Sequence, residues 1–92
     1  MRVAIIMGSM SDFDKVEPMI NLLKLYGVEV VARCLSAHRA HSSLVEFVNE
    51  CNNNETEVII ACAGMAAALP GVVASLTTLP VIGVPLTSKN LE

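Results

Sequence analysis

Apolar and polar positions alternate along the chain in a pattern that predicts four strands separated by three helices. Apolar or β-branched runs at residues 3–7, 28–35, 58–62 and 81–84 are typical of strands in a buried sheet. Apolar residues at helical spacing predict helices from Ser11 or Asp12 to Tyr26, over 42–51 and over 66–77. This βαβαβαβ order predicts an α/β domain with a mainly parallel sheet and helices on both faces.

Residues that stop or interrupt helices refine the first two of them. Gly27 is a natural C-terminal stop for the first helix, and the run Asn52-Asn53-Asn54 ends the second. Pro18 opposes a regular helix around it, because a proline costs about 3 kcal/mol in a helix interior. We therefore expect the regular part of the first helix to begin nearer Glu17.

The composition is apolar for a domain of 92 residues, at 53% hydrophobic and 16% charged. Burial in an oligomer or against a further segment would account for this excess. The chain has no apolar run of about 20 residues and no secretory leader pattern, so we expect a cytoplasmic protein without a membrane partner. A net charge of −3 and 3% aromatic residues argue against a nucleic-acid partner.

The cysteines do not suggest a metal site. Cys34, Cys51 and Cys62 are odd in number and lack metal-ligand spacing, so we expect reduced thiols. No positive residue adjoins Cys62 in the sequence to lower its pKa, and we therefore interpret Cys62 as a core residue.

A polar cluster, Gly8-Ser9-Met10-Ser11-Asp12, directly follows the first predicted strand. Its glycine permits close backbone approach, and two hydroxyls with free amides at a helix N-terminus would bind phosphate well. Ser11 or Asp12 could equally serve only as a helix cap.

A second cluster, Ser36-Ala37-His38-Arg39, follows the second strand and is expected at the same sheet edge. Arg39 can offer a planar charged fork to a phosphate, and the ordinary pKa of a histidine, about 6.5, suits His38 to proton exchange. Alternatively, both are solvated loop residues that cap the next helix. His41 lies at the expected start of that helix, and we assign it no role.

The segment after the third strand, from Ala63 to Gly71, carries almost no functional side chains. Its small residues would let a flat ligand ring approach closely and would leave backbone amides free. Equally, they could serve only tight helix packing between subunits.

These three segments, together with Leu79-Pro80-Val81-Ile82-Gly83-Val84-Pro85, resemble the N5-carboxyaminoimidazole ribonucleotide mutase family of purine biosynthesis, in the same order across essentially the whole chain. The resemblance implies a flavodoxin-like three-layer αβα sandwich, assembled as a homo-octamer. It implies a reaction without cofactor or metal, in which a carboxylate moves from the exocyclic nitrogen of an aminoimidazole ribonucleotide to ring carbon C4. It also implies that residues 1–92 form the N-terminal part of a longer catalytic domain.

The resemblance assigns roles to individual residues. It makes His38 the general acid and base. It places the phosphate on Ser9, Ser11 and Arg39, with Ser36 supporting the phosphate side. It also makes Asp12 the acceptor of hydrogen bonds from the ribose hydroxyls. The substrate-binding residues that it implies are Ser9, Ser11, Asp12, Ser36, Arg39, Ala63 and Gly64.

The chain departs from the family pattern in two places, which keeps other functions open. The bacterial mutases usually have Gly-Gly-Ala-Ala-His-Leu-Pro-Gly after the third strand, but here Met65 replaces a glycine and Ala68 replaces the histidine. After the second strand the family has Ser-Ala-His-Arg-Thr-Pro, and here Ala40-His41 replaces the Thr-Pro. One alternative is a carbon-dioxide-dependent carboxylase of aminoimidazole ribonucleotide. Others are the related carboxylase of nickel-pincer cofactor synthesis and a non-catalytic nucleotide-binding subunit.

Overall fold

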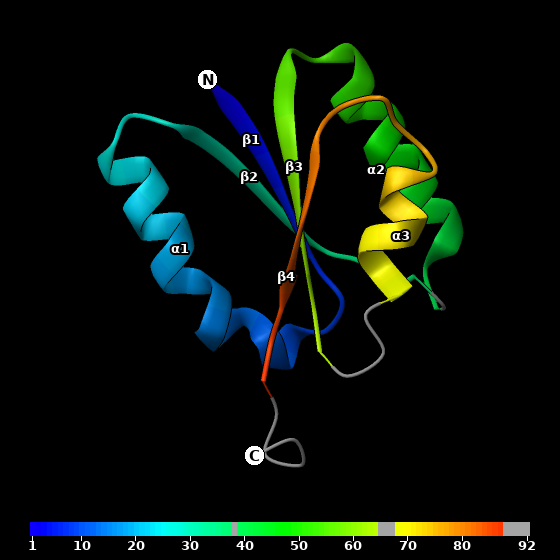
Figure 1. Cartoon of the computed structure of the whole chain (residues 1–92), viewed down its shortest axis with the longest axis horizontal. Helices are drawn as coiled ribbons and strands as arrows, with labels where there is room; N and C mark the ends of the chain where they lie inside the picture. The colour runs from blue at the N-terminus through cyan, green and yellow to red at the C-terminus, as the bar shows by residue number, and fades with distance from the viewer. Residues whose placement is uncertain (38, 65–67, 88–92) are drawn as a thin grey trace.

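In a computed structural model, which describes residues 1–37, 39–64 and 68–87, the chain builds one four-stranded parallel sheet (Figure 1). The predicted alternation of strands and helices is confirmed. The elements are, in order, β1 (Arg2–Met7), the 3-10 turn η1 (Met10–Asp12), α1 (Phe13–Leu25), β2 (Glu29–Cys34), α2 (His41–Asn53), β3 (Thr56–Ala63), α3 (Ala68–Ala74) and β4 (Val81–Pro85).

The strands lie in the order β2-β1-β3-β4, with every neighbouring pair parallel. This order matches the first four strands of a flavodoxin-like sheet. Met7 of β1 is level with Cys34 of β2 and with Cys62 of β3. The segments that follow these three strands therefore start from the same edge of the sheet.

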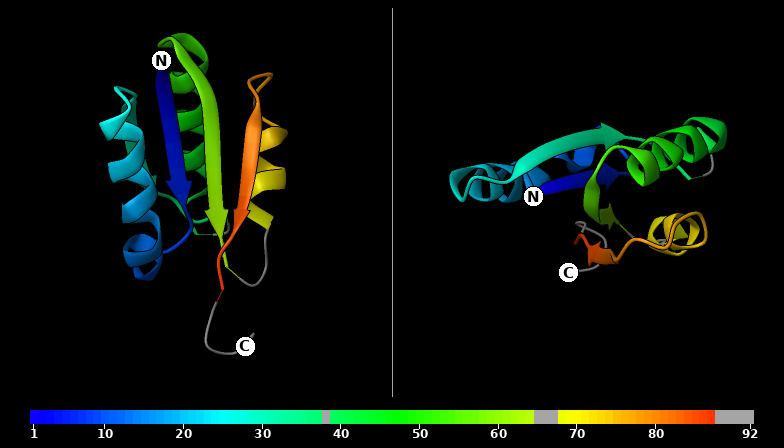
Figure 2. Two further views of the ribbon diagram at one scale, coloured as in Figure 1. Left: turned by 60° about the vertical axis from the view of Figure 1, so that its left-hand side comes forward. Right: turned by 90° about the horizontal axis from the view of Figure 1, so that it is seen from above.

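Helices cover both faces of the sheet, as the sequence predicts. Figure 2 shows α1 on one side and α2 with α3 on the other. Because side chains alternate along a strand, Ile5 of β1 packs in the core with Val16 of α1, whereas Ile6 packs in the core with Leu44 of α2. All four of these side chains are buried. The chain therefore has the flavodoxin-like three-layer αβα architecture.

The expected start of the first helix near Glu17 is wrong. Helix α1 begins at Phe13 and continues through Pro18. Pro18 lacks the backbone amide that would donate to the Asp14 carbonyl. Both residues are exposed, so water can donate a hydrogen bond to that carbonyl instead. Burial of Val16 and Ile20 on the opposite side of the helix holds it against the sheet.

The C-terminal end of α1 follows the prediction. Gly27 has φ +80°. The amide of Gly27 donates to the Lys24 carbonyl and the amide of Val28 to the Leu23 carbonyl, each at 3.0 Å, which is a Schellman motif. This cap turns the chain into β2.

Helix α3 is shorter than predicted, because it ends at Ala74 rather than Thr77. The Leu76 amide donates to the Val73 carbonyl, which tightens the last turn. The Thr77 hydroxyl bonds the side chain of Asn52 on α2, so this residue serves the connection to β4 instead of the helix. Within the described residues, none of the helices is long and apolar enough to cross a membrane.

Candidate functional site

The loops after β1 and β2 meet at the carboxyl edge of the sheet. The Leu35 amide donates to the Met7 carbonyl at 2.8 Å and so holds the two loops together where their strands end. Between them lies an open cavity of about 450 Å³ lined by Gly8, Ser9, Met10, Cys34, Ser36 and Arg39. The structure thus brings the two polar clusters of the sequence to one cavity.

Ser9 organises the first of these loops. Its Oγ accepts from the Ser11 amide at 3.2 Å and lies 2.9 Å from the Ser11 Oγ, while its carbonyl accepts from the Asp12 amide at 3.0 Å. The cap of this helical segment is therefore Ser9 and not Ser11 or Asp12, and Asp12 makes no side-chain cap bond. Since the amides of Ser11 and Asp12 already have partners, the cavity offers hydroxyls more than free helix amides.

Ser36 and Arg39 form the opposite side of the cavity. The Ser36 Oγ accepts from the Arg39 amide at 3.2 Å, which fixes the turn that leads to α2. The side chain of Arg39 is exposed, and no salt bridge to it occurs within the described residues. Arg39 therefore presents a free planar cation beside the hydroxyls, an arrangement suited to a phosphate.

Of the other predicted binding residues, Ser11 lies in η1 beside Ser9 but does not line this cavity, and three more lie near the end of β3. Ala63 ends β3, Gly64 follows it, and the Ala63 carbonyl accepts from the Leu86 amide at 2.8 Å. Asp12 is half-buried, and its charge acts on the thiol of Cys62 next to Ala63. Asp12, Ala63 and Gly64 thus make a second group at the same sheet edge.

The predicted catalytic residue, His38, lies outside the described residues, as do Met65 and the two alanines that follow it. The role of His38 stays a prediction from the sequence. His41 is exposed at the first position of α2, where the sequence places it. Ala68, the alanine that replaces the family's histidine, belongs to α3.

Three cavity residues, Gly8, Met10 and Cys34, were not among the predicted binding residues, although Gly8 belongs to the first polar cluster. Met10 lies between Ser9 and Ser11, and Cys34 is the last residue of β2, so both stand beside residues that the sequence does identify. Met10 is 67% exposed. Adjacency to a polar cluster at a strand end is the pattern that could have indicated them.

The buried thiols lack the features of nucleophiles. Burial raises the pKa of Cys62, and the negative charge of Asp12 raises it further. Burial is also the largest cause of the raised pKa of Cys51, so both thiols stay protonated at neutral pH. No group of three or more potential metal ligands occurs among residues 1–37, 39–64 and 68–87.

Comparison with known proteins gives a consistent result. The family described as AIR carboxylase matches residues 2–92. An N5-carboxyaminoimidazole ribonucleotide mutase of Saccharolobus solfataricus is 50% identical over 99% of this chain and 58% of its own length. A mutase of the same name from Methanocaldococcus jannaschii is 52% identical over 95% of this chain and 54% of its own length.

The solved structures agree with the sequence relatives. A crystal structure of Treponema denticola PurE superposes with a TM-score of 0.90 at 31% identity, and the alignment covers 97% of this chain and 57% of that one. The chain therefore spans about half the length of the proteins that it matches.

Proposed function

This chain belongs to the AIR carboxylase family, and from that premise we propose that it forms part of an N5-carboxyaminoimidazole ribonucleotide mutase. The substrate is the ribonucleotide that carries a carboxylate on its exocyclic nitrogen. The product carries the carboxylate on ring carbon C4. The same atoms are present before and after the reaction, which makes it an isomerisation in purine biosynthesis.

One observation carries the proposal: the cavity at the carboxyl edge joins Ser9, Ser36 and Arg39 from two separate loops. A phosphate monoester needs hydroxyl donors and a cation at one place, and the proposal puts the phosphate of the substrate there. The ribose hydroxyls then lie toward Asp12, whose carboxylate can accept from them. The imidazole ring lies against Ala63 and Gly64, where the absence of large side chains permits close approach.

His38 moves the protons in this proposal. A protonated His38 donates to the exocyclic nitrogen as its bond to the carboxylate breaks, which releases carbon dioxide and leaves aminoimidazole ribonucleotide. Ring carbon C4 then attacks the carbon dioxide, and the now neutral His38 removes the C4 proton. Proton transfer of this kind contributes about 10²–10⁴-fold to rate, and confinement of carbon dioxide next to C4 adds the advantage of proximity.

A second candidate is the carboxylase that combines free carbon dioxide with aminoimidazole ribonucleotide. The family description itself favours it, since it names AIR carboxylase. Both reactions use the same ring carbon and the same phosphate site. They differ in whether carbon dioxide enters from solution or from the substrate.

The proposal extends to the assembly, which we expect to be a cytoplasmic homo-octamer. Large apolar side chains are exposed on α1, at its C-cap and on β4, namely Leu22, Leu25, Tyr26 and Ile82. Contact between subunits would remove such side chains from water.

The test is turnover by the protein expressed from its full reading frame, followed by ultraviolet absorbance. We expect N5-carboxyaminoimidazole ribonucleotide to be converted without added bicarbonate. His38→Asn should abolish conversion while nucleotide binding persists. The matched control is His41→Asn, which removes the other histidine of the chain from the start of α2 and should leave the rate within about twofold.

Each other outcome identifies a different function. Conversion of aminoimidazole ribonucleotide only with bicarbonate would establish the carboxylase. Binding without turnover by a folded protein would indicate a nucleotide-binding subunit. A rate that His41→Asn lowers as much as His38→Asn would remove His38 from its assigned role.

A further inference from the structure

Lys15 lies in the first turn of α1, where a positive charge does not stabilise the helix. It is the third residue of α1, and a positive charge near a helix N-terminus opposes the helix dipole. Its ammonium group instead donates to the carbonyl of Thr87, a residue 72 positions later that lies just beyond β4. A tertiary contact therefore accounts for this lysine better than helix formation does.

The segment that Lys15 contacts is also bonded to the candidate site. The amide of Leu86 donates to the carbonyl of Ala63 at 2.8 Å, and the Leu86 side chain packs against the core on the α1 side of the sheet. In Figure 1, β4 runs down toward the start of α1. Two contacts from different elements thus hold residues 86–87.

We propose that Lys15 is a positioning residue, which fixes residues 86–87 so that the backbone of Ala63 and Gly64 is held in place for the substrate ring. This inference rests on the proposed function, because it is that proposal which sets the ring against Ala63 and Gly64. Lys15 itself touches neither the substrate nor the reacting atoms. It acts through Thr87, Leu86 and the Ala63 carbonyl in turn.

The proposal separates binding from chemistry. Without the Lys15 contact, residues 86–87 open more often and the Ala63 carbonyl loses its partner during each opening. Ordering this backbone then reduces the free energy of substrate binding, which weakens affinity. Proton transfer by His38 is unaffected once the substrate is bound, so the rate at saturation stays the same.

The first measurement is the hydrogen exchange rate of the Leu86 amide, recorded by NMR on the protein expressed from its full reading frame. Lys15→Met should raise this rate about threefold to fivefold, because it removes an exposed hydrogen bond from a charged donor. Lys15→Arg keeps a charged donor and should restore the rate to within about twofold. Lys24→Met is the matched control, since it removes the same charge from the last turn of the same helix and should not change the rate.

The second measurement is the steady-state kinetics of N5-carboxyaminoimidazole ribonucleotide conversion by the same variants. We expect Lys15→Met to raise KM about threefold to fivefold with kcat within twofold, and Lys15→Arg to restore KM. A variant that merely loosened the fold would not divide its effect in this way.

Several results would overturn the proposal. Lys15→Met could exchange and turn over like Lys24→Met, its kcat could fall with a raised KM, or Lys15→Arg could fail to restore KM. A wild-type protein without turnover would refute the proposed function instead, and the Leu86 exchange rate would still show whether Lys15 orders residues 86–87.

Discussion

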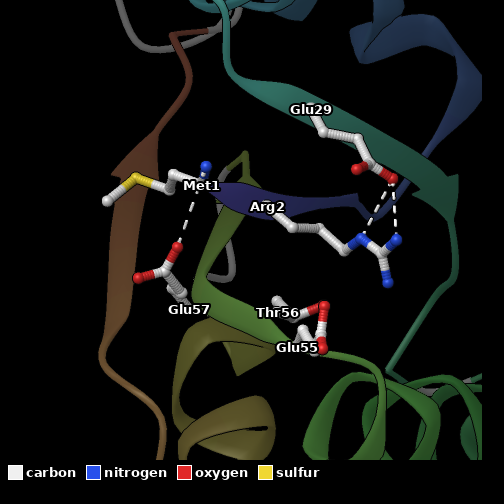
Figure 3. A pocket seen from close by; sticks show the side chains of 6 residues that line it. All are labelled: Met1, Arg2, Glu29, Glu55, Thr56 and Glu57. Carbon is white, nitrogen blue, oxygen red and sulfur yellow. Dashed lines mark hydrogen bonds and ion pairs between the residues drawn. The ribbon is translucent and has the colours of Figure 1, made fainter.

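The two edges of the sheet carry cavities of nearly equal size, about 450 Å³ at the carboxyl edge and about 460 Å³ at the amino edge. The amino-edge cavity is lined by Met1, Arg2, Glu29, Glu55, Thr56 and Glu57 (Figure 3). Both contain charged side chains. Cavity size therefore does not distinguish them.

The polar groups of the amino edge are largely bonded to one another. Arg2 is bonded to Glu29 at 2.9 Å, and the N-terminal amine lies 3.9 Å from the Glu57 carboxylate; Figure 3 marks both contacts with dashed lines. Arg2 also donates to the carbonyl of Asn54, whose side chain accepts from the Thr56 hydroxyl at 2.6 Å. A ligand at this edge would have to break existing bonds.

At the carboxyl edge the cation is available. Arg39 forms no salt bridge within the described part of the chain, and it stands across the cavity from Ser9 and its hydroxyl. A ligand that brings negative charge there can pair with Arg39 without breaking an ion pair of the described residues. The comparison teaches that partners already present, more than volume, separate a structural edge from a candidate binding edge.

Among these predictions, Arg39→Met should have the largest effect, a loss of nucleotide affinity at the carboxyl-edge cavity. It keeps an unbranched apolar stem and removes the charged fork, so affinity for the nucleotide should fall about 100-fold, while the Tm stays within about 2 °C. Isothermal titration calorimetry and thermal unfolding measure the two quantities. The matched control is Arg33→Met, since Arg33 lies over the Phe47 ring at 5.3 Å and lines a different cavity.

Equal losses of affinity in the Arg39 and Arg33 variants would show that overall charge, not a fork in this cavity, attracts the ligand. The proposed phosphate site would then be wrong, although the family assignment would stand.

The rates at which Cys34 and Cys51 are alkylated give a second comparison of the two edges. Cys34 lines the carboxyl-edge cavity, whereas Cys51 is buried in α2 and its thiol bonds Thr56 near the amino edge. Burial raises the pKa of Cys51, so less of its reactive thiolate exists at any pH below that pKa. We expect iodoacetamide to modify Cys34 first, and saturating nucleotide to slow that reaction about tenfold.

Mass spectrometry of timed samples gives the rates at each cysteine. An unchanged rate at Cys34 with bound nucleotide would place the ligand outside this cavity. Modification of Cys51 in the folded protein at the same rate as Cys34 would contradict the burial on which the comparison depends.

Arg2→Met should act on stability and not on binding. It removes the bonds to Glu29 and to the Asn54 carbonyl, but these groups are partly exposed, so we expect a loss of only about 1 kcal/mol in the free energy of unfolding. For a domain of this size that lowers the Tm by about 4–8 °C. Nucleotide affinity, measured by calorimetry, should stay within twofold, and a larger loss would connect the amino edge to the site.

The sequence predicts the strands and the sheet edge well, because continuous apolar runs and the rule for parallel crossovers depend only on local pattern and general topology. Pro18 shows where local rules fail. A propensity measured in isolated helices does not include the burial of Val16 and Ile20, which holds α1 together across the proline. The early end of α3 likewise depends on a tertiary partner, Asn52 on α2.

The candidate site is predicted in part for a similar reason. The position of a motif after a strand predicts that Ser9, Ser36 and Arg39 come together, and the cavity confirms this. The pairing of the Ser11 amide with Ser9 could not be predicted, because it depends on how the turn closes. The contact of Lys15 with Thr87 joins residues too distant in sequence for any local pattern to indicate.

Glu55, beside Arg2 at the amino edge, gives the smallest expected effect. The sequence places the end of α2 at its asparagine run, yet the residue with a left-handed backbone is the next one, Glu55, at φ +69°. A residue with a Cβ is strained there, so Glu55→Gly should raise the free energy of unfolding by about 0.5–1 kcal/mol. Urea unfolding at constant pH measures the change.

Gly27, at φ +80°, supplies the reverse substitution at a comparable backbone. A Cβ at Gly27 would meet no atom within 4 Å, so Gly27→Ala tests backbone strain alone and should cost about 1 kcal/mol. If Glu55→Gly instead lowers stability while Gly27→Ala behaves as expected, the carboxylate of Glu55 contributes more to the amino edge than its backbone costs. The amino edge would then be stabilised by its acidic side chains as well as by Arg2, which would sharpen its contrast with the carboxyl edge.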